Sequence, residues 1–553
     1  MSSVYTILVL LSAFCFINGF ITWIEPRLPL PGRRAPPGSP WPHPQVWISS
    51  HKRLSIDIQN FVFTSNARSC DIIDQGLWRY RNYAFPDSKG TKDASVPQLT
   101  GLGVEVEDKS CGYPKLGDDE SYKIEVPDSG EAKITSKTVW GAIKGLETFS
   151  QLVYQDDKTR VYYINKTTID DFPTFTYRGI LLDTARHFQP MKVLKQNLDA
   201  MAFNKFNVFH WHLVDDQAFP FESKIFPNLT KLGAYSQKHI YSQKDMKDII
   251  EYARLRGIRV MPEIDTPGHA YALGRAFPHL LTPCYGEGPD KPYTTNYPEH
   301  SEAETLYPIQ NETYEFLRIL FGEVRSLFPD DYMHLGMDEV YYACWKSNPH
   351  IKAFMEKNGM KDYNEIEQYY VRNAIKVVKD VGYKYMTWQD PVDNGVTMAP
   401  DTIVEIWKDK YLDPNLDYWE KYITPIAKKG YQMVLSACWY LNYIDYGQDW
   451  KKYYNCDPRG FPGTEEEKNL VIGGEACMWG EYVDGTNLIA RLWPRASAVA
   501  ERLWSHASLN NTDDASFRLD QHRCRMLRRG IPAQPILNGF CGDYEWEIDS
   551  EYP

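Results

Sequence analysis

RGILLDT (178–184) is a short apolar run of the kind that forms a strand buried on both faces of a parallel sheet. Two more runs of this kind follow it, FNVFHWHLV (206–214) and GIRVMPEID (257–265). They predict the first three strands of an α/β fold.

The segment between the second and third runs predicts a helix. Met246, Ile249, Ile250 and Ala253 recur at i, i+3, i+4 and i+7, and Gly257 is suited to end the helix. Strand, helix and strand in this order predict a parallel βαβ unit.

Five further strand-like runs follow along the chain, and helical segments of normal length separate several of the eight. They are DYMHLGMDE (331–339), YKYMTWQ (383–389), TIVEIW (402–407), YQMVLSACWY (431–440) and VIGGEACMW (471–479). Eight such units predict a (β/α)8 TIM barrel that occupies residues 173–553.

The part before the barrel predicts a leader and a smaller domain. The apolar run over residues 1–20 is short for a membrane span, so we expect a signal peptide at 1–19. Residues 25–44 are rich in proline and predict an extended arm. The mixed region that follows ends in the helix-like AIKGLETFSQLV (142–153). We therefore expect an α+β domain, with its arm, at 20–172.

The charge balance excludes some partners. The formal net charge is -12, whereas nucleic acids and anionic membranes bind basic surfaces. After the signal peptide, no apolar stretch is long enough for an integral membrane segment. N-x-T sequons begin at Asn165, Asn228, Asn311 and Asn510. These features predict a glycosylated lysosomal or secreted protein.

Polar and aromatic residues gather where the predicted strands end. They are Asp215, Asp265, Asp338, Glu339, Trp388, Trp407, Tyr440, Trp479 and Glu481. The carboxyl ends of the strands form the catalytic face of a TIM barrel. Paired acids such as Asp338 and Glu339 suit glycosidic cleavage, which needs a proton donor and a stabiliser of positive charge. The simpler alternative is a solvated pair of loop acids.

Two other patterns leave alternatives open. His210 and His212 share one face of a strand, with Asp215 just beyond, which is also the pattern of a zinc hydrolase. His269 in DTPGHA gains interest only from its company with the acids. Trp388, Trp407 and Trp479 end different strands, so they could form a pocket for a flat apolar group or could be ordinary core residues.

The motifs together resemble glycoside hydrolase family 20, the β-N-acetylhexosaminidases, in particular the animal lysosomal type. They are RGILLDTARHF, NVFHWHLVDD, GIRVMPEIDTPGHA, HLGMDEV, TWQD, WYLNYIDYG and GGEACMWGEYVD. The resemblance covers about residues 45 to 545. It implies an exo-glycosidase acting on glycans that carry terminal N-acetylhexosamine, an N-terminal α/β domain, a homodimer and no cofactor or metal.

The resemblance also implies roles for individual residues. Glu339 matches the general acid/base, while Asp338 and Tyr440 match the pair that holds the 2-acetamido group as it attacks the anomeric carbon. Asp338 should stay ionised while Glu339 begins protonated. The remaining matches are Asp215 and His269 coupled to the acid, Arg186 and Glu481 on the sugar hydroxyls, and Trp388, Trp407 and Trp479 around the acetamido methyl.

Two positions depart from the family pattern. Met337 replaces the second glycine of HxGGDE and places a bulky side chain beside the acid. Asn442 and Tyr443 stand where the family distinguishes neutral from anionic substrates, and a tyrosine favours neutral ones. The resemblance further implies disulfides Cys70–Cys111, Cys284–Cys344 and Cys524–Cys541. A Cys438–Cys456 pair would leave Cys477 as a buried thiol.

A carbohydrate-binding protein that has lost catalysis is the alternative from another functional class. Retention of Asp338, Glu339 and Tyr440 together argues against it, and the zinc-dependent barrel hydrolase remains a second alternative.

Overall fold

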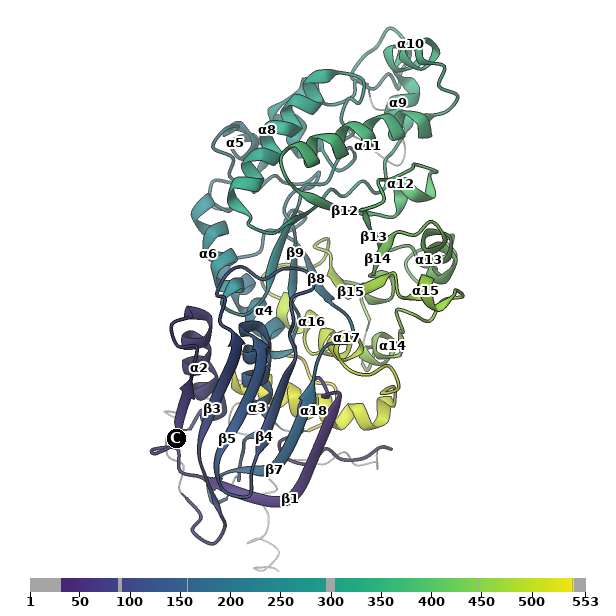
Figure 1. Cartoon of the computed structure of the whole chain (residues 1–553). Coiled ribbons are helices and arrows are strands. Elements are labelled where there is room, and N and C mark those ends of the chain that lie inside the picture. Colours follow the sequence, from purple (N-terminus) through teal and green to yellow (C-terminus); the bar gives the residue numbers. More distant parts are fainter. Residues whose placement is uncertain are drawn as a thin grey trace, which may run out of the picture.

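The computed structural model of the chain describes residues 31–87, 92–156, 158–294, 304–445, 447–539 and 541. The expected signal peptide at 1–19 lies outside these residues. A mixed sheet formed by the N-terminal part lies against a closed barrel formed by the rest (Figure 1).

Eight parallel strands close the barrel, which confirms the predicted fold class. Each strand pairs with the next one along the chain, and the last pairs with the first. They are β8 (Tyr177–Asp183), β9 (Val208–His212), β10 (Arg259–Glu263), β11 (Tyr332–His334), β12 (Lys384–Trp388), β13 (Ile403–Ile406), β14 (Gln432–Leu435) and β15 (Val471–Met478).

Most strands are slightly shorter than the predicted runs, and two of them, β11 and β14, end well before their runs do. The run 331–339 forms a strand only to His334, because Gly336 and Met337 adopt left-handed backbone with φ of 66° and 75°. The run 431–440 leaves the sheet after Leu435 and turns into the 3-10 helix η2 (Ala437–Trp439). Both breaks lie at the carboxyl ends of the strands, where the chain turns out of the barrel wall.

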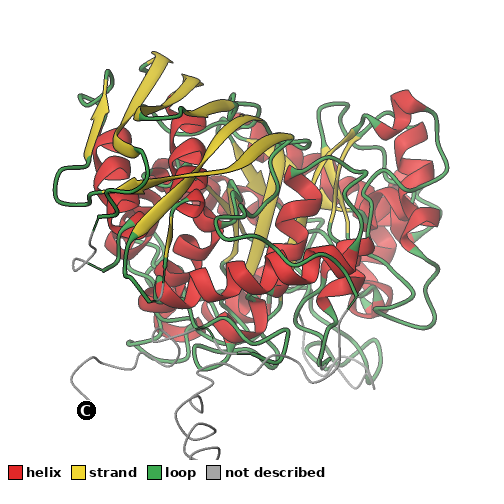
Figure 2. Ribbon diagram, turned by 90° about the horizontal axis from the view of Figure 1, so that it is seen from below, coloured by secondary structure: helices red, strands yellow, loops and turns green. Residues whose placement is uncertain are grey.

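Helices lie outside the strands of the barrel (Figure 2). The longer ones are α4 (Met191–Phe203), α6 (Gln243–Arg254), α8 (Asn311–Leu327), α10 (Pro349–Asn358), α11 (Tyr363–Asp380), α13 (Trp419–Lys428), α17 (Arg495–Trp504) and α18 (Thr512–Arg528). The helix predicted between residues 246 and 253 is α6, whose four predicted apolar residues are all buried. Gly257 follows with φ of 67°. No helix among the described residues has the length and apolarity that a membrane crossing requires.

The barrel interior is filled in layers. Apolar side chains from six strands form its floor: Tyr177, Val208, Met261, Met386, Ile403 and Val434. Above them lies a fully buried charged layer of His210, Glu263, His334, Glu405 and Glu475. Aromatic side chains form the top layer, next to the carboxyl ends of the strands. This stacking follows from the two-residue alternation of each strand.

The N-terminal sheet carries its helices on the side that faces the barrel (Figure 1). Its strands are β1 (Val46–Ile56), β2 (Val62–Ser65), β3 (Gln98–Asp108), β4 (Tyr122–Val126), β5 (Gly130–Thr138), β6 (Tyr154–Gln155) and β7 (Tyr162–Asp171), and its helices are α2 (Asp71–Ala84) and α3 (Val139–Leu152). Every residue of α3 is buried. Lys144 of α3 donates to the carbonyl of Phe206 in the barrel. The helix therefore joins two hydrophobic cores.

The proline-rich arm has no helix or strand over the described residues 31–45. Its Trp41 is fully buried, accepts from Gln151 through its carbonyl and donates from its indole to the Ser497 carbonyl. The arm thus connects α3 with α17, as an extended segment can.

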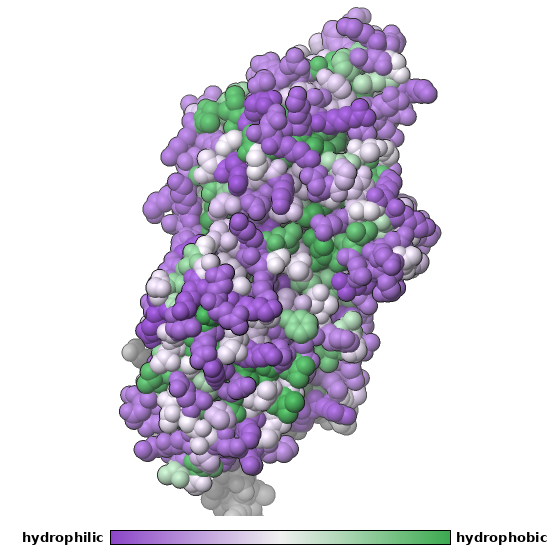
Figure 3. Space-filling view, in the orientation of Figure 1, coloured by the Kyte–Doolittle hydropathy of each residue, from purple (hydrophilic) through white to green (hydrophobic). Residues whose placement is uncertain are grey.

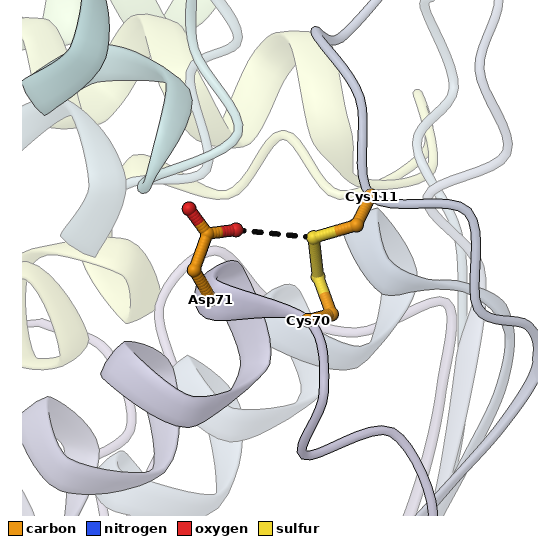
Figure 4. Close-up of side chains that lie close together, drawn as sticks. All are labelled: Cys70, Asp71 and Cys111. Atoms are coloured by element: carbon orange, nitrogen blue, oxygen red, sulfur yellow. Dashed lines mark hydrogen bonds between the residues drawn. A yellow bond between two sulfur atoms is a disulfide. The ribbon is translucent and has the colours of Figure 1, made fainter.

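Four disulfides join the pairs Cys70–Cys111, Cys284–Cys344, Cys438–Cys456 and Cys524–Cys541, and Cys477 is a buried free thiol. Figure 4 shows Asp71 beside the first of them, with its Oδ1 3.1 Å from Cys111 Sγ. Asp71 also pairs with Arg254 at the end of α6, so this corner links the sheet to the barrel.

Buried ion pairs hold the two parts together, and one of them generates a stability prediction. The Lys205 ammonium and the Asp171 carboxylate lie 3.3 Å apart and are fully buried. We expect Asp171→Ala to lower the free energy of unfolding by about 3–5 kcal/mol, because it leaves the lysine charge buried and unpaired. Urea unfolding followed by tryptophan fluorescence measures the change.

The neighbouring Asp170 is the control. It pairs with Lys123 at 2.8 Å, but both side chains are about half exposed. Asp170→Ala should therefore cost about 1 kcal/mol or less. Equal unfolding midpoints for the two variants would contradict the role given to burial.

Candidate active site

The predicted site residues lie at the carboxyl ends of all eight barrel strands. Arg186 follows β8, Asp215 follows β9, His269 follows β10, Asp338 and Glu339 follow β11, Trp388 ends β12, Trp407 follows β13, Tyr440 follows β14, and Trp479 and Glu481 follow β15. Contacts between these side chains join them into one site on the barrel rim.

Asp215 lies at the centre of the polar contacts. Its buried carboxylate receives Arg186 Nη2 at 2.9 Å, His212 Nε2 at 2.8 Å and His269 Nδ1 at 3.2 Å. Burial alone would raise the pKa of Asp215, but the charges of Arg186 and His269 hold it well below its usual value. This carboxylate is therefore a fixed negative charge.

His269 connects Asp215 to both acids of the DE pair. Its Nε2 lies 3.8 Å from Asp338 Oδ2 and 3.7 Å from Glu339 Oε2. Burial opposes the imidazolium, yet Asp215 and Asp265 raise the pKa of His269 well above its usual value. The imidazole can therefore hold or pass a proton between the buried Asp215 and the outer acids.

The two adjacent acids have different environments. The Asp338 side chain is 14% exposed, whereas that of Glu339 is 59% exposed. Burial raises the pKa of Asp338 to about 6, and the nearby His269 charge limits the rise. Asp338 Oδ1 is buried and has no hydrogen-bond partner among the described residues. It is placed to accept a hydrogen bond from a ligand.

Asp265 accompanies Asp338 inside the site. Burial and the Asp338 charge raise the pKa of Asp265 well above its usual value. Of this carboxyl pair, Asp265 therefore keeps the proton and Asp338 ionises first. Asp265 Oδ1 also accepts from the Met337 N–H at 2.9 Å, which ties it to the loop that carries the acids.

The backbone of that loop is left-handed at Gly336, Met337 and Glu339, with φ of 66°, 75° and 48°. A Cβ atom at position 336 would lie 1.7 Å from Asp265 Oδ1, so only glycine fits there. Met337 accepts this backbone at a cost of about 1–2 kcal/mol. Its side chain is buried in the main hydrophobic cluster, so it does not occupy the space around the acid.

Aromatic rings form a wall beside the acids. Ring centroids are 5.9 Å apart for Trp388 and Trp479, 6.3 Å for Trp479 and Tyr440, and 6.4 Å for Tyr440 and Trp407. Trp407 is fixed by a 2.7 Å hydrogen bond from its indole to Asp390 Oδ2. The three tryptophans therefore converge on one apolar cluster, as the sequence suggested.

Polar groups flank this wall on the open side. The Arg186 guanidinium lies 5.2 Å from the Trp479 ring centroid and also pairs with Asp183 at 3.2 Å. Glu481 is exposed, and its charge adds to those that raise the pKa of Arg186. Asn442 Oδ1 is buried without a hydrogen-bond partner in the described part of the chain.

Four residues that the sequence did not predict as site residues form hydrogen bonds with the site: Asp183, Glu263, Asp265 and Asp390. Asp265 stood out at a strand end, but nothing marked it as the neighbour of Asp338. Glu263 carried a signal of another kind, a charge inside an apolar strand. Such a residue needs a buried partner, and the sequence does not say which.

The zinc alternative requires an available nitrogen on His210 and His212. Both nitrogens of His212 face carboxylates, Glu263 at 2.5 Å and Asp215 at 2.8 Å. Although burial opposes protonation, these carboxylates raise the pKa of His212 to about 9. His210 is likewise placed between Glu263 and Glu475. The pattern is that of protonated imidazoles in ion pairs, whereas a metal needs a neutral one.

Comparisons with known proteins agree with this geometry. Residues 175–507 match the catalytic domain of glycosyl hydrolase family 20, and residues 40–152 match a domain described as beta-acetyl hexosaminidase like. The chain is 47% identical to the beta-hexosaminidase subunit alpha of Rattus norvegicus, over 91% of this chain and 94% of that protein. It is 43% identical to the beta-hexosaminidase subunit beta of Homo sapiens, over 92% and 91%.

A solved structure extends the likeness to three dimensions. The chitobiase of Flavobacterium johnsoniae is 31% identical and superposes with a TM-score of 0.76, over 89% of this chain and 73% of that one. With the matched catalytic domain spanning the whole barrel, these likenesses establish that the chain belongs to glycosyl hydrolase family 20.

Proposed function

We propose that the chain is a retaining exo-glycosidase that removes terminal β-linked N-acetylhexosamine from glycans. The observation that carries the proposal is an Asp338 side chain only 14% exposed beside a Glu339 side chain 59% exposed, both within 3.8 Å of His269, next to a wall of four aromatic rings. The related enzyme of Vibrio harveyi, 25% identical, has been solved in complex with N-acetylglucosamine. Relatives named beta-hexosaminidase support the same activity.

The proposed mechanism uses the substrate's own amide as nucleophile. Asp338 accepts from the acetamido N–H while Tyr440 donates to its oxygen, which then attacks the anomeric carbon. Glu339 gives its proton to the leaving oxygen as the glycosidic bond breaks, so an oxazolinium forms. Water, deprotonated by Glu339, then opens the ring with net retention. An internal nucleophile offers an effective molarity of about 10⁵–10⁸ M.

The other site residues receive supporting roles in this proposal. Asp215 and His269 couple to the proton of Glu339. Arg186 binds the 3- and 4-hydroxyls, and Glu481 accepts from the 4- and 6-hydroxyls. Trp388, Trp407 and Trp479 surround the acetamido methyl, with Asn442 at their edge. Tyr443, which is 39% exposed, brings no positive charge and favours neutral glycosides.

The compartment and processing belong to the same proposal. We expect a signal peptide at 1–19, domains at 20–172 and 173–553, and a lysosomal or secreted location. Asn228, Asn311 and Asn510 are exposed and suit glycosylation. Asn165 is half-buried and its amide oxygen accepts from Tyr154 at 2.9 Å, whereas a glycan would attach to its amide nitrogen.

Activity is tested with a chromogenic N-acetylglucosaminide between pH 4 and 7. We expect turnover that a chelator does not affect, and a loss of about 10²- to 10⁴-fold in Glu339→Gln on a substrate with a poor leaving group. The loss should shrink for an activated aryl leaving group, which departs without protonation.

Two outcomes would point elsewhere. A wild-type protein that binds the sugar without turnover would favour the carbohydrate-binding alternative. Activity that a chelator removes and zinc restores would favour the metal hydrolase.

Burial of Asp338 generates a pH prediction. Its folded pKa of about 6 exceeds the unfolded value of about 3.9, so the folded state binds the extra proton between these limits. Stability therefore falls as pH rises through this window, and the cost is complete above pH 6. We expect Asp338→Asn to raise the melting temperature at pH 7 and to change it little at pH 4. Scanning calorimetry at the two pH values measures this, and an equal gain at both would contradict it.

We further propose a homodimer. Exposed side chains near the site, Tyr411, Tyr418, Tyr443 and Ile444, offer an apolar surface, on which the rings of Tyr411 and Tyr418 lie 5.8 Å apart and the Tyr443 hydroxyl donates to the Leu412 carbonyl. Sedimentation should give a dimer for the wild type and a monomer for Ile444→Asp with Tyr411→Asp. A dimer that survives both changes would place the interface elsewhere.

A further inference from the structure

We propose that Glu263, in the charged layer of the barrel, is a positioning residue for the reaction. It holds the charge of His212 and the orientation of Trp388 through one carboxylate. The inference rests on the proposed function, because it concerns how that site keeps its charges and its shape.

The contacts of Glu263 reach separate parts of the site. Its side chain is fully buried. Oε2 lies 2.5 Å from His212 Nδ1, and Oε1 accepts from the Trp388 indole N–H at 3.1 Å. His334 Nδ1 is 3.1 Å from Oε1 and 3.1 Å from the N–H of Gly336, in the loop that carries the acids. One side chain thus supports the relay and the aromatic wall. His334 Nδ1 accepts from the Gly336 N–H, so it has no proton to donate to Glu263.

The contact with His212 starts a chain of alternating charges. Burial would raise the pKa of Glu263, but the charges of its neighbours, His212 first among them, hold this pKa well below its usual value. Glu263 is therefore negative. His212 is positive, Asp215 is negative, and His269 is positive and lies 3.7 Å from Glu339. Inside a protein each such charge needs its neighbour, because an unpaired buried charge is strongly unfavourable. Loss of the Glu263 charge therefore lowers the pKa of His212. When His212 loses its proton, the negative charge of Asp215 loses a stabilising neighbour.

Other charged groups surround Glu263 from the neighbouring strands. His210 Nε2 lies 3.1 Å from Glu263 Oε2, and the other ring nitrogen, Nδ1, lies 2.7 Å from Glu475 Oε1. His334 Nε2 lies 3.6 Å from Glu405 Oε2. Burial and Glu475 raise the pKa of Glu405 well above its usual value, so this carboxyl is neutral. Asp265, two residues on, is neutral for a similar reason.

Glu405 therefore serves as the matched control. It is equally buried and belongs to the same layer, but neither of its oxygens has a hydrogen-bond partner among the described residues. Its backbone is the register partner of Trp388, but no side-chain hydrogen bond among the described residues connects Glu405 to His212 or Trp388. Because Glu405 is neutral, Glu405→Gln changes a buried side chain of this layer without removing a charge, so an effect of altered packing would appear in it as well as in Glu263→Gln.

The test compares Glu263→Gln, Glu263→Asp and Glu405→Gln. We expect Glu263→Gln to lower kcat/KM about 10- to 100-fold and to move the alkaline limb of its pH profile down by about one unit, because His212 loses its proton earlier. Glu263→Asp keeps the charge, so its alkaline limb stays in place. Glu263→Asp should bind a thiazoline mimic of the oxazolinium about tenfold more weakly, since its shorter side chain withdraws the acceptor from Trp388, whereas Glu263→Gln keeps an amide oxygen that can accept from the indole. Glu405→Gln should change neither property.

The proposal is overturned if Glu263→Gln keeps the wild-type pH profile, or if Glu405→Gln shifts it equally. If Glu263→Gln does not fold, histidine NMR of the wild-type protein decides. Two low-field imidazolium N–H signals, assigned by their loss in His212→Gln, should persist at pH 7.5, and their absence overturns the proposal. Wild-type turnover is measured separately, so failure of the proposed function is distinguished from failure of this inference.

Discussion

Closing eight strands into a barrel creates an interior that side chains must fill, and in this chain charged side chains fill its middle layer. A single charge there without a partner would cost several kcal/mol. The layer is tolerated because its carboxylates alternate with imidazoles, as in Glu475, His210 and Glu263. The same side chains therefore determine both the packing of the barrel interior and the charge state of its upper rim. A substitution among them changes both.

The layers above and below determine which end of the barrel these charges face. The apolar floor formed by Tyr177, Val208 and their neighbours separates the charges from the far end of the barrel. The aromatic layer above covers them from the substrate side. Negative and positive groups then alternate outward through His212 and Asp215 to the rim. Dipoles and charges fixed in this way need not reorganise when positive charge develops on a substrate, which is how a preorganised site stabilises a transition state.

Much of the fold could be predicted because short apolar runs and helical periodicity are local properties. The runs at 178–184 and 257–265 both became strands, and the residues at the strand ends met on one rim. Where β11 ends was not predictable, because the left-handed turn that requires glycine at 336 packs against Asp265, in the segment that follows β10.

The partners of buried charges were hidden for a similar reason. Glu263 visibly interrupts an apolar run, but its neighbours His212, His334 and Trp388 come from three other strands. Only the order and stagger of the closed barrel bring them to one carboxylate. The sequence can therefore reveal that a buried charge exists, while closure of the barrel decides what it does.

The left-handed turn before the acids explains how two adjacent carboxyls come to differ. Consecutive residues of a regular strand would place Asp338 and Glu339 on opposite sides of the barrel wall. With Gly336, Met337 and Glu339 in left-handed backbone, both side chains instead reach His269, one from the interior and one from the open side. Burial of the Met337 side chain in the core offsets the strain of its backbone. The same turn thus sets the inner acid where solvent is scarce and the outer acid on the open side, where the proposed mechanism needs a proton donor.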